Sequence, residues 1–194
     1  MSCSEDFERS FSKRSKRMLF VGHMFMAAPH PMIACIGLLV VGLGWLSSRS
    51  KFRYIVGPTL IVFSLLLGAI LWQLWFITPN RPFYDYLSRG LAPIVSITFV
   101  VGIATYGLLM TALFNLGRKY DIALFRCAAT SFAFAVIVTF FAASLLVLSA
   151  SRSPVITPSG FSIILTTFEL SLISAIALNF LGNLLASIGF IRRR

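Results

Sequence analysis

Four long apolar runs, almost free of charged side chains, follow one another through most of the sequence. They cover 54–77, 91–117, 127–150 and 161–191, and the last is interrupted only by Glu169. A helix needs about 20 apolar residues to cross the hydrocarbon core of a bilayer, and each run is longer than that. The pattern therefore predicts an all-α integral membrane protein with four transmembrane helices near these ranges.

An earlier apolar stretch, 18–47, is broken near its middle by the sequence Pro29-His30-Pro31. Each proline removes a backbone donor and disfavours helix at the residue before it. The break leaves arms of about 11 and 16 residues, each shorter than a full span. We expect a re-entrant helical hairpin that turns at these residues. The alternative is a single kinked span, which would give the protein five spans.

The positions of the Lys and Arg residues distinguish these two topologies. If 18–47 crosses the bilayer once, eight of the 17 basic residues lie on one side and nine on the other. If it returns to the side from which it entered, the division becomes fourteen against three. Cytoplasmic loops are enriched in Lys and Arg. The charges therefore favour the hairpin, with both the N-terminus and the C-terminus in the cytoplasm.

Composition supports a membrane protein and divides the chain into three parts. The 194 residues are 58% hydrophobic and 12% charged, too apolar for an ordinary soluble domain. The parts are a basic cytoplasmic N-terminal segment (1–17), the hairpin or kinked span (18–47) and a four-helix bundle with short loops (48–194). The net charge of +11 lies in short segments beside the apolar runs, which indicates contact with anionic headgroups rather than nucleic acid.

The last apolar run carries both small and polar residues at helical spacing. Small residues allow helices to approach closely inside lipid, and we expect a packing face at Ser171, Ala175, Gly182, Ala186 and Gly189. A helical wheel places Glu169 within about 40° of Asn183 and Ser187. We expect this side, with nearby Asn179, to contact a partner or an ion, while a carboxyl satisfied by neighbours such as Thr98, Thr105, Tyr106 or Gln73 is the alternative.

Other chemistry-bearing residues give weaker indications. Cys3 and Cys127 lie near basic residues, where S-palmitoylation occurs. The alternative for each is a small side chain that only fills space. His23, Met24, Met26, His30 and Met32 offer ligands that suit copper, but Met is more often apolar bulk. The sequence contains no paired carboxylates, catalytic triad or phosphate-binding loop. We expect no enzymatic activity, no cofactor and no metal.

These observations favour a non-enzymatic accessory or assembly subunit that packs against a larger membrane partner. The segments outside the membrane are too short to form a soluble functional domain. A small oligomeric carrier or channel that uses Glu169 is the second hypothesis, and a membrane-shaping hairpin protein is the third. The expected partners are membrane lipids, including anionic headgroups, and a membrane protein or further copies of this chain.

Overall fold

A computed structural model describes residues 3–28, 30–73, 92–151 and 158–191. The described residues are almost entirely helical and contain no strand. Their helices, in chain order, are α1 (Cys3–Ser10), α2 (Lys13–Met26), α3 (Pro31–Leu46), α4 (Arg53–Trp72), α6 (Ala92–Lys119), α7 (Ala123–Ser151) and α8 (Pro158–Ile191).

Four of these helices are long and apolar enough to cross a bilayer, which confirms the four runs predicted from the sequence. The qualifying stretches are Arg53–Trp72, Ser96–Lys119, Ala123–Ala142 and Thr166–Ile191. The chain is therefore a helical protein of the multi-pass membrane type. The end of the first run, residues 74–77, lies outside the described residues.

Residues 18–47 form parts of two helices packed side by side in opposite directions. Glycines make this contact possible: a Cβ on Gly22 would lie 2.7 Å from the backbone nitrogen of Val41, and one on Gly37 would lie 2.5 Å from that of Met26. Ser15 at the start of α2 donates a hydrogen bond of 2.8 Å to the carbonyl of Gly44 at the end of α3. The pair is therefore a helical hairpin of two separate helices.

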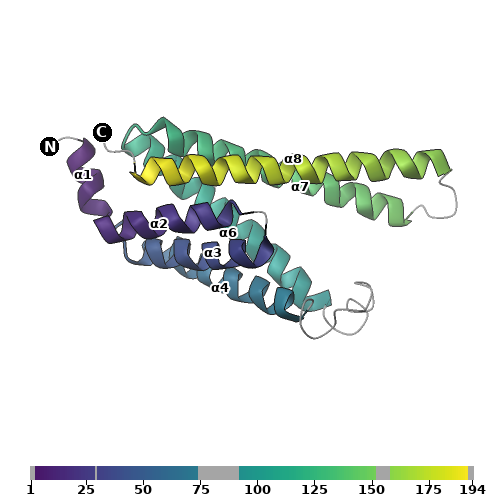
Figure 1. Ribbon diagram of the computed structural model, residues 1–194, viewed down its shortest axis with the longest axis horizontal. Helices are drawn as coiled ribbons and strands as arrows, with labels where there is room; N and C mark the ends of the chain where they lie inside the picture. The colour runs from purple at the N-terminus through teal and green to yellow at the C-terminus, as the bar shows by residue number, and fades with distance from the viewer. Residues whose placement is uncertain (1–2, 29, 74–91, 152–157, 192–194) are drawn as a thin grey trace.

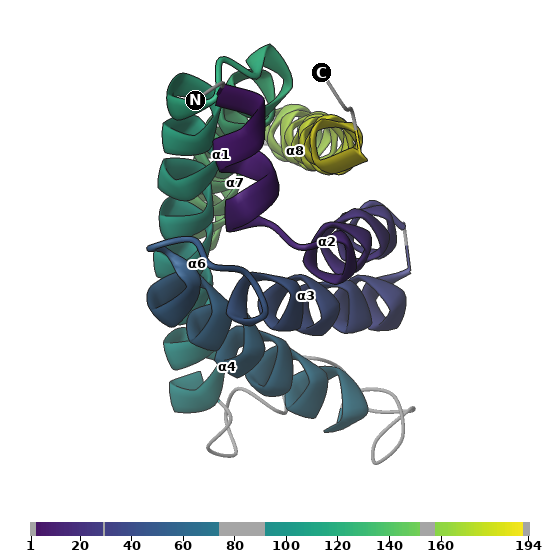
Figure 2. The same cartoon turned by 90° about the vertical axis from the view of Figure 1, so that its left-hand side faces the viewer.

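The hairpin lies between α8 and α4, and it covers only part of the length of α8. Figure 1 shows the turn between α2 and α3 near the middle of the molecule, while α7 and α8 continue well beyond it. At 34 residues, α8 is about 51 Å long, whereas the 14 residues of α2 give about 21 Å. Figure 2 shows α2 and α3 between α8 on one side and α4 on the other, with α1 lying at the end that faces the viewer.

An aromatic cluster closes the end of the bundle where α1 lies. Phe11, which directly follows α1, contacts Trp45 of α3 and Phe190 of α8, with ring centroids 5.7 and 5.6 Å apart. Phe190 also lies 4.7 Å from Phe125 of α7. The hydroxyls of Ser10 and Tyr120 share a hydrogen bond of 2.8 Å, which ties α1 to the turn after α6. Four helices and one turn are thus joined at one end.

The boundary expected at residue 17 falls inside α2. Ser12 is the N-cap of this helix, and its hydroxyl accepts a hydrogen bond of 3.2 Å from the backbone nitrogen of Ser15. A serine at this position satisfies one of the free donors of the first helical turn. The basic residues from Lys13 to Arg17 therefore form the first turns of α2.

Candidate functional site

A chain of polar side chains connects α2, α8 and α6 inside the bundle. Nδ1 of His23 lies 2.9 Å from Oδ1 of Asn183, and both residues are fully buried. The Asn183 amide donates to the carbonyl oxygen of Asn179, at 2.9 Å. Oδ1 of Asn179 in turn accepts from the hydroxyl of Tyr106 at 3.3 Å. Because the amide of Asn183 acts as the donor towards Asn179, its oxygen is the acceptor, and His23 donates through Nδ1.

This polar chain holds the hairpin against the last helix. Polar contacts between helices in a bilayer are worth about 0.6–2 kcal/mol each, a modest gain because the same groups also find partners before the helices pack. A second contact joins the same two helices one turn along, where the Ser187 hydroxyl lies 3.6 Å from the sulfur of Met24. The ring of His23 also stacks on Phe190, with centroids 6.0 Å apart and planes 14° apart. The hairpin is therefore fixed to α8 by specific contacts as well as by close packing.

Asn183, Ser187 and Asn179, which the sequence analysis offered as partner or ion contacts, all have partners within the chain. Glu169 differs from them. Its side chain is exposed, and it has no hydrogen-bond or ion-pair partner among the described residues. It lies 14 residues, or about 21 Å, from Asn183 along α8, so a shared helix face does not bring the two side chains together.

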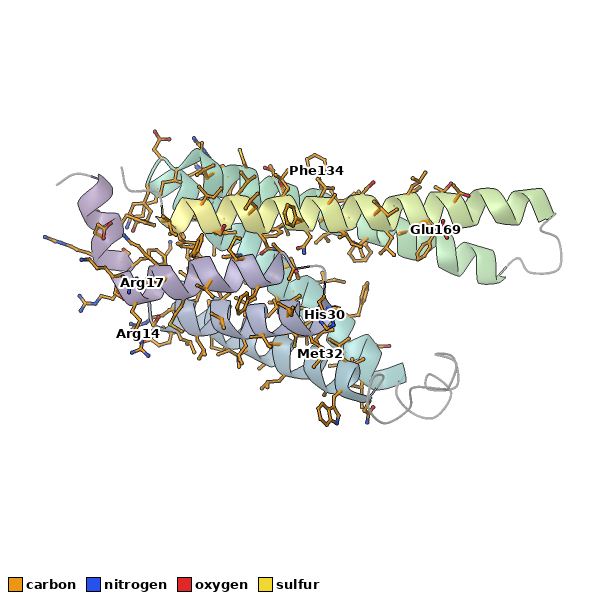
Figure 3. The ribbon with its side chains drawn as sticks, in the orientation of Figure 1. Arg14, Arg17, His30, Met32, Phe134 and Glu169 are labelled. Carbon is orange, nitrogen blue, oxygen red and sulfur yellow. The ribbon has the colours of Figure 1, made fainter. Side chains whose placement is uncertain are left out.

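The expected neighbours of Glu169 also bond elsewhere. Thr98 donates to the carbonyl of Ile94 at 2.7 Å, and Thr105 lies 3.5 Å from the carbonyl of Thr59. Glu169 lies 22 residues from Ile191, or about 33 Å along the helix, which exceeds the 30 Å thickness of a typical hydrocarbon core. Figure 3 shows it on the part of α8 that continues beyond His30 and the hairpin turn. If Ile191 marks one membrane surface, the carboxyl lies at the opposite edge of the core.

An open apolar groove of about 680 Å³ begins where the hairpin ends. We call it the hairpin groove. Residues of the hairpin turn and of α3, α4, α6, α7 and α8 line it, and Asn179 and Tyr106 of the polar chain are among them. Several of its lining residues are small, namely Ala28, Ala34, Gly102, Ala135 and Ala175. Its size and its apolar lining with a few polar groups are typical of sites that bind another molecule.

The small residues predicted as a packing face of α8 lie in different surroundings. Gly182 and Gly189 face the rings of Phe132 and Phe125 of α7, each of which would lie less than 3 Å from an added Cβ. Ala186 is fully buried, and Ala175 is buried beside the hairpin groove. Ser171 is half-buried and donates to the carbonyl of Thr167 in its own helix, at 2.8 Å.

At the hairpin turn, His30 is the N-cap residue of α3 and Pro31 is the first residue of that helix, while Pro29 lies outside the described residues. Cys127 is exposed near the start of α7. Cys3 is the first residue of α1, and its side chain lies outside those described.

Within the part of the chain that the structure describes, no group of three or more His, Cys, Asp or Glu side chains has an arrangement that could hold a metal ion. The hairpin groove was not predicted from the sequence, because it is formed by helices far apart in the chain. Comparison with family models, with curated proteins and with solved structures finds no match to this chain.

Proposed function

We propose that this protein is a non-enzymatic accessory or assembly subunit, and that it receives a transmembrane helix of a larger membrane protein in the hairpin groove. The main support for this proposal is that the hairpin packs beside α8 along only part of the length of that helix. Beyond the turn, the same place in the bundle is an open apolar groove. A partner helix placed there would complete the bundle.

In this proposal α4, α6, α7 and α8 span the membrane and the α2–α3 hairpin enters and returns from the cytoplasmic side. Support comes from the antiparallel packing of α2 and α3 and from the fourteen basic residues that this topology places in the cytoplasm. His30 and Pro31 at the turn are exposed in the isolated chain, so this topology would place an exposed turn within the membrane, where a docked partner helix would cover it.

The composition of the hairpin groove favours a helix as its occupant. Helices in lipid associate where small residues let their backbones approach, and the hairpin, α6, α7 and α8 each contribute a small residue to this groove. An acyl chain requires no such close approach. Glu169, Leu172 and Ile176 are three and four residues apart, which places the carboxyl on the groove side of α8, beyond Leu172. The amide nitrogen of Asn179, which has no partner among the described residues, offers a donor in the groove.

The exposed carboxyl of Glu169 defines the chemistry of the partner. A partner helix lying in the hairpin groove would pass Glu169 close to the membrane surface opposite to Ile191. The partner is therefore expected to carry Lys or Arg at that level, where an ion pair would form as the two proteins dock. The carrier hypothesis lacks this support, since Glu169 lies about 21 Å along the helix from Asn183. The membrane-shaping hypothesis is also disfavoured, because the hairpin packs between α4 and α8 rather than standing free.

Filling the hairpin groove tests this proposal. Ala175 lines the groove and is buried, whereas Ala177, two residues later on α8, is exposed and lines no part of it. Tagged full-length wild-type protein and the variants Ala175→Phe and Ala177→Phe are extracted from the native host in mild detergent. A photo-crosslinking residue placed at Ile176 identifies what lies in the groove, and one at exposed Ile137 on α7 serves as its control.

We expect one larger membrane protein to copurify at fixed stoichiometry, to crosslink at Ile176 and to be lost with Ala175→Phe alone. Equal capture by both variants would place any partner elsewhere and overturn the proposal. A lipid or other small apolar molecule lost with Ala175→Phe, without a protein partner, would replace the proposal with the carrier hypothesis. Crosslinking only to further copies of this chain would show a homo-oligomer instead of an accessory subunit.

A further inference from the structure

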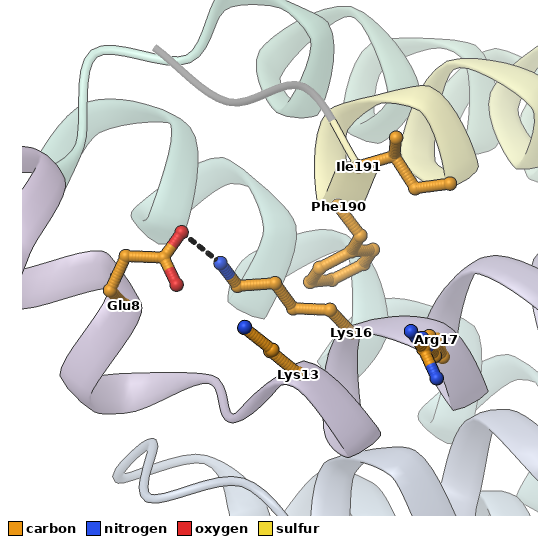
Figure 4. Close-up of a pocket in the computed structure, with 6 residues that line it drawn as sticks. All are labelled: Glu8, Lys13, Lys16, Arg17, Phe190 and Ile191. Atoms are coloured by element: carbon orange, nitrogen blue, oxygen red, sulfur yellow. Dashed lines mark hydrogen bonds and ion pairs between the residues drawn. The ribbon is translucent and has the colours of Figure 1, made fainter.

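A small pocket at the end of the bundle near α1 collects basic side chains. It has a volume of about 300 Å³ and lies between α1, the start of α2 and the end of α8. We call it the basic pocket. Its lining residues are Glu8, Lys13, Lys16, Arg17, Phe190 and Ile191, and all six are labelled in Figure 4.

Among the described residues, one cation of the basic pocket has an ion-pair partner and two have none. The ammonium group of Lys16 forms an ion pair with Glu8 and lies 5.0 Å from the centre of the Phe7 ring. Lys13 and Arg17 are exposed and have no ion-pair or hydrogen-bond partner among the described residues, including the carbonyls that end α8. The pocket therefore keeps two positive charges that nothing within the described chain neutralises.

The two unpaired cations lie near the amino end of α2, where the helix dipole does not favour positive charge. The amino end of a helix carries a partial positive charge, so its first turn usually holds Asp or Glu. The first turn of α2 has no acidic residue and instead begins with Lys13 and Arg14. Lys13 and Arg17 are also four residues apart, where like charges on a helix repel each other. A bound anion would relieve both sources of repulsion.

The floor of the basic pocket is apolar. Phe190 is buried in the aromatic cluster, while the side chain of Ile191 is 54% exposed beside the cations. Basic pockets next to membrane helices on the cytoplasmic side bind the head groups of anionic lipids. We propose that the basic pocket binds a phosphate group, with Lys13 and Arg17 as its free ligands and Lys16 as the ligand held in place by Glu8. The apolar floor would receive the glycerol and upper chain of a phospholipid.

The test measures binding of individual ligands to the full-length protein in a neutral detergent, by native mass spectrometry. The ligands are phosphatidylglycerol, phosphatidylcholine as the zwitterionic control, and inorganic phosphate alone. The pocket variant carries Lys13→Gln with Arg17→Gln. The control variant carries Arg49→Gln with Lys51→Gln, which removes the same charge from exposed residues that do not line the pocket.

We expect the pocket variant to lose about 30-fold in affinity for phosphatidylglycerol, since each basic residue near an anionic lipid contributes about a factor of five. The control variant should change by less than about twofold, because its residues are not in the pocket. Equal losses in the two variants, or equal binding of phosphatidylcholine, would overturn the proposal. Inorganic phosphate that displaces the lipid would assign the pocket to soluble phosphate compounds. Phosphate that does not displace it would assign the pocket to lipid, and both results retain phosphate recognition.

Discussion

Gly37 gives a sharp test of the hairpin, because it lies where α2 and α3 approach most closely. A Cβ built on it would be 2.5 Å from the backbone nitrogen of Met26 and 2.7 Å from the carbonyl oxygen of Gly22. These are backbone atoms, so no rotation of a side chain can relieve the contact. Replacing Gly37 by Ala would require the two helices to separate by about 1 Å to restore ordinary contact distances.

Gly107 provides a matched control for this substitution. It also lies inside an apolar helix, α6, but no neighbouring atom beyond the local backbone of α6 lies within 4 Å of the position its Cβ would take. Replacing Gly by Ala in a helix raises intrinsic helix propensity by about 1 kcal/mol at either site. This gain cancels when the two variants are compared. Overpacking in a close-packed interior typically costs about 1–3 kcal/mol, and we expect Gly37→Ala to be less stable than Gly107→Ala by that amount.

Unfolding of the two variants in mixed micelles, with a rising fraction of denaturing detergent and helix content as the signal, measures the difference. Wild-type protein in the same series shows whether Gly107→Ala gains the expected stability. Equal midpoints for Gly37→Ala and Gly107→Ala would refute the reasoning, because they would show that α2 and α3 are not in backbone contact. The antiparallel hairpin would then have to be abandoned.

Three further predictions concern topology, the polar chain and Glu169. In a cysteine-free background, a cysteine at exposed Lys51 should react with an impermeant thiol reagent only from the cytoplasmic side, and one at residue 86 only from outside; the reverse result would invert the proposed orientation. Asn183→Leu should cost about 1–3 kcal/mol because it leaves His23 unpaired in the interior, whereas the same change at exposed Asn115 should cost little; equal effects would remove the polar chain as a stabilising element. Glu169→Gln should leave the stability of the isolated protein unchanged and reduce partner retention, as read by the midpoint of unfolding and by copurification; a large loss of stability would show that the carboxyl has a structural role.

Hydrophobic length alone predicted the four long helices, because the bilayer imposes the same minimum on every span. The two-proline break predicted that 18–47 would not form one continuous helix. The start of α2 could also have been found, since Ser12 precedes the first helical turn and has the chemistry of an N-cap. These features depend on residues close together in the sequence, and the physical reasons for them act locally.

The contacts between helices could not be predicted in the same way. A helical wheel grouped Glu169 with Asn183 and Ser187, but it ignores the rise along a helix of 34 residues. The wheel also says nothing about which other helix a polar side chain will meet. Asn183 bonds to His23, and no local pattern connects those residues. The hairpin groove and the basic pocket likewise depend on how far the hairpin extends beside α8 and on where α1 turns across its end.

The bond between His23 and Asn183 also has a consequence for the order in which the protein is assembled. The two residues are separated by 160 positions in the chain. At a synthesis rate of about 5–20 residues per second, roughly 8–32 s pass between the appearance of the first and the second. During that time the hairpin has been made, but the helix that receives His23 has not. The hairpin must therefore exist during that time without its contact to α8, with the glycine contacts between α2 and α3 as its own support, and its docking on α8 is among the last steps of folding.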